Sequence, residues 1–329
     1  MVDAASFEDA LYCTPFFIVG CPRSGTTLLR LMLDSHPSLA IPDESSFIVD
    51  LRGWRGGGRS PAVALERALA HPRFSRWGLD PAVVRRMAAA ASPSSYAEAM
   101  RVMFAAYAAS QRKSRWGDKT AIHVAHIPLL AKLFPTAQFI HLIRDGREVA
   151  VSSAERDWGP RTPIAGALLW RRWVGTARAA GQRLEPERYL EVRLEQLIAT
   201  PESVLRGICD FLGEQFAPEM LEYHDTAEAR VWSDAAGARR HLHRHVALPP
   251  TAGLRDWRAG LSAAQQAAVE AAAQPLLGEL GYAAQRFAPT AAIRARLDWL
   301  RWLPFHATRE ALKQVGGFNP EPRFWHGEG

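Results

Sequence analysis

A glycine-rich turn close to the start of the chain is the segment whose residue types are best suited to binding an anion. The turn spans residues 20–25, follows the apolar residues 16–19 and precedes a segment of helical periodicity at residues 26–35. Such a turn exposes free backbone N–H groups at the positive end of the helix dipole, and both features favour a bound phosphate. Its spacing fits the pattern G-x-x-x-x-G-K-[ST] everywhere except at Thr26, which replaces the lysine. We therefore expect a phosphate site here.

The missing lysine narrows the class of ligand. A nucleoside triphosphatase uses that lysine to hold the β- and γ-phosphates, so threonine at this position argues against a kinase or nucleotidase. A nucleotide with one 5′-phosphate and a less charged transferable group does not need the lysine, and Arg23 supplies a positive charge within the turn. The residues expected to contact the 5′ end of the nucleotide are Pro22, Arg23, Ser24, Gly25, Thr26 and Thr27.

A second group of anion-binding residues follows the largely apolar residues 138–143, which are predicted to form a strand. Arg144 stands at the end of that strand, Ser152 comes eight residues later, and Arg156 follows four residues after Ser152. In a helix that starts near Gly146, Ser152 and Arg156 share one face. An arginine at a strand end and a Ser–Arg helix face can hold a phosphate by charge-assisted hydrogen bonds, so we expect a second phosphate site.

These two segments resemble those of the sulfotransferases that use 3′-phosphoadenosine 5′-phosphosulfate (PAPS). Residues 16–37, FFIVGCPRSGTTLLRLMLDSHP, look like the loop that binds the 5′-phosphosulfate in that family, and residues 138–153, QFIHLIRDGREVAVSS, are similar to the segment that binds the 3′-phosphate. The spacing and the LDSHP ending most resemble the tyrosylprotein sulfotransferases and related bacterial sulfotransferases. The resemblance extends over roughly residues 16–282. It implies PAPS as co-substrate, no metal, and transfer of a sulfuryl group to an acceptor hydroxyl.

The same resemblance implies three catalytic residues. In sulfuryl transfer, as in phosphoryl transfer, an acceptor oxygen attacks in line, the bridging oxygen gains negative charge and a base takes the acceptor proton. Lys119 resembles the family lysine that contacts the sulfuryl group, and Arg23 is the second cation. Glu44, which follows Arg23 by 21 residues, matches the family glutamate and is expected to be the base. Asp43 is the close alternative, although it is also interpreted as a cap for the helix that begins near Ser45.

Histidines offer further alternatives for the base. Some sulfotransferases use a histidine two residues after the equivalent of Lys119, but that position is Ala121 here. His36, His123 and His126 are other candidates. Each of the three is interpreted first as a helix-end or packing residue.

Two expected contacts to the nucleotide depart from the family pattern. Leu194 stands where the family often has a tyrosine, and Asp256 stands where it often has a lysine. Arg255 and Arg258 lie close to Asp256 and are expected to bind a phosphate in place of the lysine. The basic segment at residues 239–245, RRHLHRH, is interpreted equally as a segment that closes over the nucleotide and as a solvated loop.

Strands and helices alternate along most of the chain. Besides the strands at residues 16–19 and 138–143, short strands are predicted near residues 115–118 and 188–192. The predicted helices span residues 26–35, 122–134, 147–156, 164–182, 201–212 and 262–280. Such alternation is typical of an α/β fold in which helices flank a mainly parallel sheet. We therefore predict a three-layer fold like that of the P-loop-containing nucleotide-binding proteins.

One domain, residues 1–285, is predicted to hold both phosphate sites. It includes a helical insertion at about residues 45–111, with helix caps at Ser60 and Asp80. Residues 286–329 form a C-terminal tail that is amphipathic in its first half and rich in glycine and proline toward its end. We expect the tail to pack on the domain, with weak contact to a membrane surface as the alternative.

Composition excludes several classes of protein. The 329 residues are 48% hydrophobic and 22% charged, as in ordinary globular proteins. A net charge of +6 suits an anionic ligand but does not by itself indicate nucleic acid, and no nucleic-acid partner is predicted. Three cysteines without a C-x-x-C pair argue against a disulfide framework and a structural zinc site. No apolar run is long enough to cross a membrane, and the N-terminal residues lack the pattern of a signal peptide, so we expect a cytoplasmic protein.

The sequence thus predicts a cytoplasmic PAPS-dependent sulfotransferase whose acceptor is a hydroxyl of a glycan, a lipid, a small metabolite or tyrosine. It carries no signal for an oligomeric state. One alternative is a P-loop kinase or nucleotidase, against which Thr26 and the lack of an evident Walker-B aspartate argue. Another is a nucleotide-binding module without catalysis, against which Arg23, Glu44 and Lys119 together argue.

Overall fold

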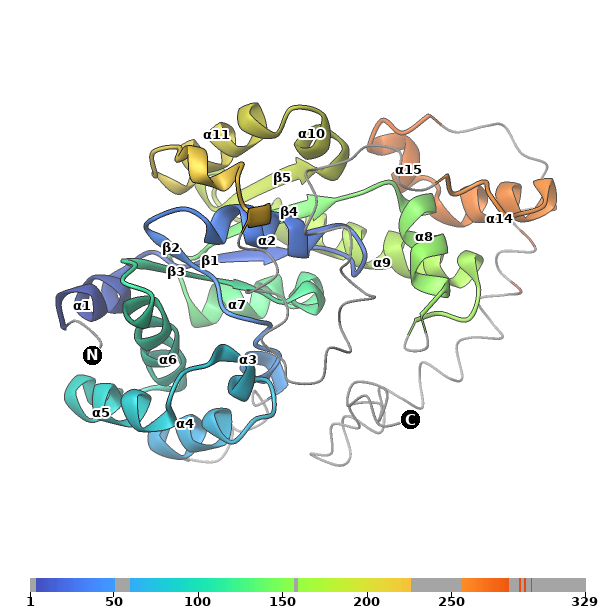
Figure 1. Ribbon diagram of the computed structural model, residues 1–329. Helices are drawn as coiled ribbons and strands as arrows, with labels where there is room; N and C mark the ends of the chain where they lie inside the picture. Colours follow the sequence, from blue (N-terminus) through green and yellow to red (C-terminus); the bar gives the residue numbers. More distant parts are fainter. Residues whose placement is uncertain are drawn as a thin grey trace.

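Five parallel strands form the centre of the computed structural model, which describes residues 4–50, 60–156, 159–225 and 256–283 together with Thr290, Ile293 and Leu297 (Figure 1). The strands are β1 (Phe16–Val19), β2 (Leu39–Ala40), β3 (Arg115–Lys119), β4 (Gln138–Ile143) and β5 (Tyr189–Arg193). Their order across the sheet is β2-β3-β1-β4-β5, and every neighbouring pair is parallel. The predicted parallel sheet is therefore confirmed, and the short edge strand β2 is an addition to it.

Helices flank the sheet. The main body holds α1 (Ala4–Tyr12), α2 (Thr26–Asp34), α7 (Ile127–Leu133), α8 (Gly146–Ala154), α9 (Pro163–Gly181), α10 (Leu194–Ala199) and α11 (Pro201–Leu212), with the 3₁₀ segments η3 (Ala121–Ala125), η4 (Pro186–Arg188) and η5 (Pro218–Met220). The insertion holds α3 (Phe47–Asp50), α4 (Pro61–Leu69), η2 (Phe74–Trp77), α5 (Pro81–Ala91) and α6 (Tyr96–Ser110). The C-terminal pair is α14 (Ala263–Ala273) and α15 (Leu276–Glu279). In Figure 1 the insertion lies below the sheet, and α14 lies beside α8 and α9.

The central strand β1 is buried on both faces, which explains why its four residues are all apolar. Phe17 and Val19 belong to the core shared with α6 and the insertion. Phe16 and Ile18 belong to the core shared with α2 and α11. Because successive side chains of a strand alternate between its faces, this one strand anchors both layers and fixes the point where the glycine-rich turn begins.

The insertion is helical, as predicted, and its two predicted caps are confirmed. Ser60 accepts a hydrogen bond from the N–H of Val63, and Asp80 accepts one from the N–H of Ala82. Each cap precedes a proline at the start of its helix, where the missing N–H of proline costs no hydrogen bond. These local signals set the starts of α4 and α5.

Three predicted helices are divided or end earlier than expected. The helix predicted at residues 122–134 is divided into η3 and α7, and the one predicted at residues 262–280 into α14 and α15. Prolines explain both breaks, because Pro128 and Pro275 lack an N–H group and their rings clash with the preceding turn. The helix predicted to reach residue 156 ends at Ala154.

Several predictions fall on residues outside the described ranges. These are Arg255, the basic segment 239–245 and almost all of the tail beyond residue 285. Two described residues of the tail, Ile293 and Leu297, are 57% and 53% exposed. The domain boundaries and the contacts of the tail stay predictions. None of the described helices is long and apolar enough to cross a membrane.

Candidate active site

The glycine-rich turn forms a tight loop between β1 and α2. Arg23 and Gly25 both have positive φ angles, 76° and 89°. Glycine adopts this conformation freely, whereas arginine does so at a cost of roughly 1–3 kcal/mol. Gly20 is required for another reason, because a Cβ atom there would lie 2.6 Å from the carbonyl oxygen of Leu142. The loop therefore passes closely over β4.

The N-terminus of α2 opens onto this loop. Gly25 is the N-cap residue and offers no side chain to the first turn of the helix. The N–H groups of a first turn have no partner within the helix, and those of Thr26 and Thr27 belong to this turn. Together with the helix dipole they favour an anion, as the spacing of the glycines predicts.

On one side of the loop, the structure brings Arg23, Arg144 and Ser152 together. Nε of Arg23 donates to Oγ of Ser152 at 3.1 Å. Nη1 of Arg144 donates to the carbonyl oxygen of Arg23, also at 3.1 Å. Ser152 is buried on α8, while both arginines are half-buried. The two predicted phosphate sites are thus neighbours, connected by Arg23.

Arg156 does not share a helix face with Ser152, and that prediction is wrong. It follows Glu155, the C-cap residue of α8, because the helix stops at Ala154. Within the described part of the chain, the guanidinium of Arg156 has no hydrogen bond to the other predicted anion-binding residues. Its contact with a phosphate stays a prediction.

On the other side of the loop, Lys119 connects α2 to Glu44. Lys119 ends β3 and pairs in register with Ile18 of β1, so it emerges at the same end of the sheet as the loop. Its Nζ lies 2.8 Å from Oε1 of Glu44 and 3.4 Å from Oγ1 of Thr27. The expected base and the expected cation are therefore in direct contact beside the loop.

Glu44 is held by a second cation as well. Nη1 of Arg73 lies 3.0 Å from Oε2 of Glu44. Burial alone would raise the pKa of this carboxyl, but Lys119 and Arg73 outweigh burial and lower the pKa to about 2. Glu44 is therefore ionised at neutral pH, and it is a weak base for as long as both cations contact it.

The alternative base His123 belongs to a buried network. Its Nδ1 lies 2.8 Å from Asp118, and both side chains are fully buried. The Asp118 carboxylate also accepts hydrogen bonds from the hydroxyls of Ser45 and Thr120. This network attaches the segment that carries Glu44 to the end of β3, so its role is structural.

The remaining alternatives have other partners. Nε2 of His36 lies 2.7 Å from a backbone carbonyl oxygen, as expected of a packing residue. His126 is the N-cap residue of α7. Asp43 accepts the N–H of Glu44 at 2.8 Å and lies 3.9 Å from Arg76. Of the candidate bases, Glu44 is the one that contacts Lys119.

Leu194, at the position where the family often has a tyrosine, packs against the loop. It is the first residue of α10, and a Cβ atom at Gly25 would lie 2.6 Å from its Cδ1. The leucine therefore fills the space beside the loop glycine. Its role is to support the loop by packing.

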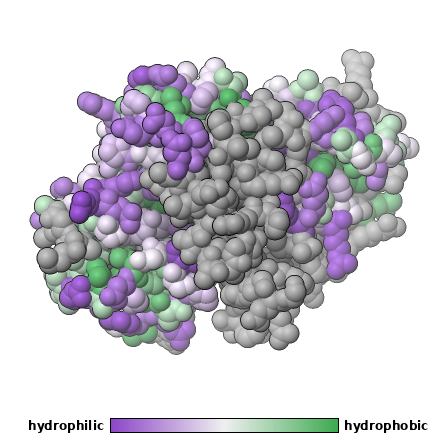
Figure 2. Space-filling view, viewed as in Figure 1, coloured by the Kyte–Doolittle hydropathy of each residue, from purple (hydrophilic) through white to green (hydrophobic). Residues whose placement is uncertain are grey.

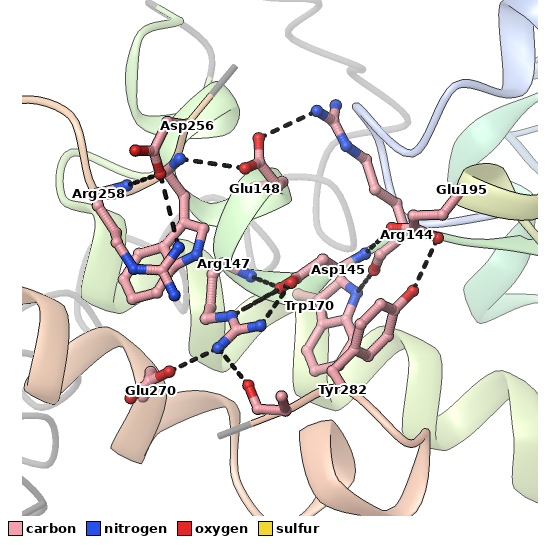
Figure 3. A network of polar contacts seen from close by, with 12 residues as sticks. Arg144, Asp145, Arg147, Glu148, Trp170, Glu195, Asp256, Arg258, Glu270 and Tyr282 are labelled. Carbon is pink, nitrogen blue, oxygen red and sulfur yellow. Dashed lines mark hydrogen bonds and ion pairs between the residues drawn. The ribbon is translucent and has the colours of Figure 1, made fainter. Parts of the chain in front are cut away.

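A network of charged residues connects the end of β4 to the C-terminal helices (Figure 3). Nη2 of Arg144 lies 3.2 Å from Oε2 of Glu148, and Oε1 of Glu148 accepts the N–H of Trp257 at 3.1 Å. Arg147 pairs with Glu270 of α14, and its guanidinium lies 4.9 Å from the centre of the Trp257 ring. The second predicted phosphate site is therefore also the platform on which residues 256–283 dock.

Arg258 contacts its own neighbours in this network. Its guanidinium lies 4.7 Å from the centre of the Trp257 ring and 3.7 Å from the carboxylate of Asp256. Asp256, at the position of the family lysine, therefore pairs with Arg258. A contact of Arg258 with the nucleotide stays a prediction, and Arg255 lies outside the described residues.

Two site residues escaped the sequence reasoning. Arg73 lies 29 residues after Glu44, inside the insertion, so no local spacing connects the pair. Glu148 lies four residues after Arg144, and this spacing is a signal that could have indicated their contact.

The sequence of this chain is similar to those of known sulfotransferases. Residues 15–218 match a family model described as "Sulfotransferase family". Protein-tyrosine sulfotransferase 1 of Danio rerio is 26% identical over 282 residues, which cover 81% of this chain and 71% of that protein. Protein-tyrosine sulfotransferase 2 of Gallus gallus is 26% identical over 222 residues, which cover 64% of this chain and 53% of that protein.

A solved structure of a sulfotransferase domain is similar to this chain as well. The sulfotransferase domain of the Synechococcus PCC 7002 olefin synthase is 25% identical to this chain, with a TM-score of 0.60, and the match covers 83% of this chain and 96% of that domain. This chain thus spans about half (53%) of the length of the chicken protein and 71% of the length of the zebrafish protein. The predicted P-loop-like three-layer fold is confirmed.

Proposed function

Because this chain belongs to the sulfotransferase family, as its motifs predicted, we propose that it transfers the sulfuryl group of PAPS to an acceptor hydroxyl and releases adenosine 3′,5′-bisphosphate. The observation that carries the proposal is a pair of cationic groups on the two sides of the loop: Arg23 with Arg144 on one side, and Lys119 on the other. A donor with a phosphosulfate at its 5′ end and a phosphate at its 3′ position needs cations at both places.

The donor is bound by two groups of residues in this proposal. The N–H groups at the start of α2 and the loop residues Pro22 to Thr27 bind the 5′-phosphosulfate. Arg144 and Ser152 bind the 3′-phosphate. Arg23 belongs to the loop and contacts Ser152, so it links the two ends of the donor.

The chemical step follows from this arrangement. The acceptor oxygen attacks the sulfur in line, so that a new S–O bond forms while the S–O bond to the bridging oxygen of the 5′-phosphate breaks. Lys119 and Arg23 stabilise the negative charge that the bridging oxygen gains. The acceptor proton passes to Glu44, which later releases it to solvent.

The acceptor proposed is a hydroxyl of a glycan, a lipid, a small metabolite or tyrosine. The relatives named above include protein-tyrosine sulfotransferases, which supports tyrosine as one of these acceptors. A cytoplasmic location is part of the proposal and rests on the sequence.

A transfer assay with PAPS labelled in its sulfuryl group tests the proposal. The purified protein is incubated with the donor and a panel that contains a phenol, a tyrosine peptide, an oligosaccharide and a long-chain alcohol. We expect label in at least one acceptor and release of an equal amount of adenosine 3′,5′-bisphosphate. Binding of PAPS without transfer to any acceptor would favour a nucleotide-binding module, and phosphate transfer from ATP would favour a kinase.

A further inference from the structure

Arg73 is a buried cation for which the proposed chemistry so far has no task. It precedes η2 in the insertion and is 6% exposed. Its Nη1 contacts the Oε2 atom of Glu44 at 3.0 Å. A buried arginine is costly unless it is paired, so the fold keeps this charge in contact with the carboxylate.

The turn that carries Arg73 is fastened to the segment that carries Glu44. The N–H of Arg73 donates to Nδ1 of His71 at 3.2 Å, and the ring of His71 lies 5.6 Å from that of Phe47. From the other side of the turn, Nε1 of Trp77 donates to the carbonyl oxygen of Asp43 at 2.9 Å. The arginine and its carboxylate partner therefore belong to one packed unit.

The two cations on Glu44 stand in different surroundings. Lys119 contacts Oε1 of Glu44 and also lies 3.4 Å from Thr27, so it adjoins both the carboxylate and the proposed donor site. Arg73 contacts the other carboxylate oxygen and comes from the insertion. A donor bound at the loop brings negative charge beside Lys119, and the donor then competes with Glu44 for its ammonium group.

We propose that Arg73 is a positioning residue for the base: it holds Oε2 of Glu44, so that Oε1 keeps its orientation when Lys119 turns to the sulfuryl group of the donor. The inference rests on the proposed function, because it gives Arg73 a task in that reaction. Loss of the lysine contact makes Glu44 a stronger base once the donor is bound, while Arg73 keeps the carboxylate ionised and in place. The charged groups that face Glu44 in the described part of the chain are Lys119, Arg73 and the adjacent Asp43, which in turn faces Arg76.

Arg76 provides a matched control for Arg73. It lies three residues further along the same turn, and it faces Asp43 at 3.9 Å instead of Glu44. Arg73→Met and Arg76→Met each remove one cation and keep an apolar stem. The measurement is the pH titration of the Glu44 carboxyl carbon by NMR in protein with isotope-labelled glutamate, and Glu44→Gln identifies the signal.

The titration distinguishes a positioning role from simple packing. We expect the wild-type signal to stay that of an ionised carboxylate down to about pH 3, and the Arg73→Met signal to titrate about one pH unit or more higher. In Arg76→Met, Glu44 should titrate as in the wild type. In Arg73→Lys, its titration should return most of the way from that of Arg73→Met to that of the wild type. Equal titration of the wild type and Arg73→Met, or equal effects of the two methionine variants, would overturn the proposal.

Adding adenosine 3′,5′-bisphosphate tests the exchange of partners. Its 5′-phosphate should draw Lys119 from Glu44 and so raise the pKa of Glu44 in the wild type, with a smaller rise in Lys119→Met. The same rise in both proteins would overturn the exchange. Failure of the proposed function would look different, because the bisphosphate would then not bind and no sulfated product would form.

Discussion

Glu44 is both the proposed base and the carboxylate that pairs with Lys119 and Arg73. Glu44→Gln keeps the shape of the side chain but removes its ability to accept a proton. General base catalysis contributes about 10²–10⁴-fold, so kcat should fall by a factor of this order. Binding of adenosine 3′,5′-bisphosphate should not weaken, because Glu44 is proposed to act on the acceptor and its charge competes with the nucleotide for Lys119.

Steady-state kinetics and calorimetry on this variant check the assignment. Near-normal turnover of Glu44→Gln would move the base elsewhere, and Asp43 would be tested next. Loss of nucleotide binding would instead show that Glu44 has a structural role.

The ion pairs of Glu44 also make the stability of the fold depend on pH. Burial opposes them, but Lys119 and Arg73 lower the pKa of Glu44 from 4.5 to about 2. A lowered pKa in the folded state stabilises the protein above pH 4.5, and this contribution is lost as the pH falls toward 2.

Denaturant unfolding of the wild type and Glu44→Gln measures this effect. The wild type should be more stable at neutral pH by an amount on the order of 1–3 kcal/mol. The difference should shrink by more than half at about pH 3. A difference that stays constant with pH would contradict the ion-pair explanation.

Among the elements, β1 and β4 could be predicted because each is a largely apolar run followed by anion-binding residues. The same signal placed Arg144 at the end of its strand and Arg23 inside the loop that follows its strand. β2 could not be predicted, because the two residues Leu39–Ala40 show no periodicity and their strand exists through pairing with β3. The contact between Arg73 and Glu44 likewise depends on how the insertion folds against the sheet.

The packing of residues 256–283 on α8 allows a prediction about the stability of this segment. Glu148→Ala removes the acceptor of the N–H of Trp257, a residue of the segment before α14. A hydrogen bond of this kind contributes on the order of 1 kcal/mol, so amide exchange around Trp257 should become about fivefold faster.

Hydrogen-exchange mass spectrometry measures this change. The control is Glu66→Ala, which removes an exposed ion pair with Arg85. Glu66→Ala should leave the exchange around Trp257 unchanged. Unchanged exchange in Glu148→Ala would mean that Arg147 and the apolar core dock the segment without Glu148.

In the whole molecule, the proposed donor site lies where the carboxyl ends of β1, β3 and β4 meet, the usual place for ligands of an open α/β sheet. Its position could be predicted from the two motifs, because each of them follows a predicted strand. The contact of Arg73 with Glu44 beside this site could not be predicted, because tertiary packing alone brings the insertion to the segment that carries Glu44. On the face drawn in Figure 2, hydrophilic and hydrophobic residues are interspersed over the described parts of the surface.

Independence from metal ions is a prediction for the whole enzyme. In the proposed mechanism, Arg23 and Lys119 supply the positive charge that the transferred group needs. No group of three or more potential ligands for a metal occurs among the described residues. Because two cationic side chains are proposed to supply this charge, turnover should survive excess EDTA, and turnover that collapses and then returns with magnesium would point to a kinase.

Calorimetry with two nucleotides decides whether the donor site is what we propose. Adenosine 3′,5′-bisphosphate and adenosine 5′-monophosphate differ only in the phosphate assigned to Arg144 and Ser152. Charge-assisted hydrogen bonds contribute about 1.5–3 kcal/mol each, so the bisphosphate should bind at least about tenfold more tightly. Arg144→Ala should remove most of this preference, while Arg85→Ala, at an exposed ion pair of the insertion, should keep it. Equal affinities of the wild type for both nucleotides, or a preference that survives Arg144→Ala, would contradict the proposed PAPS site.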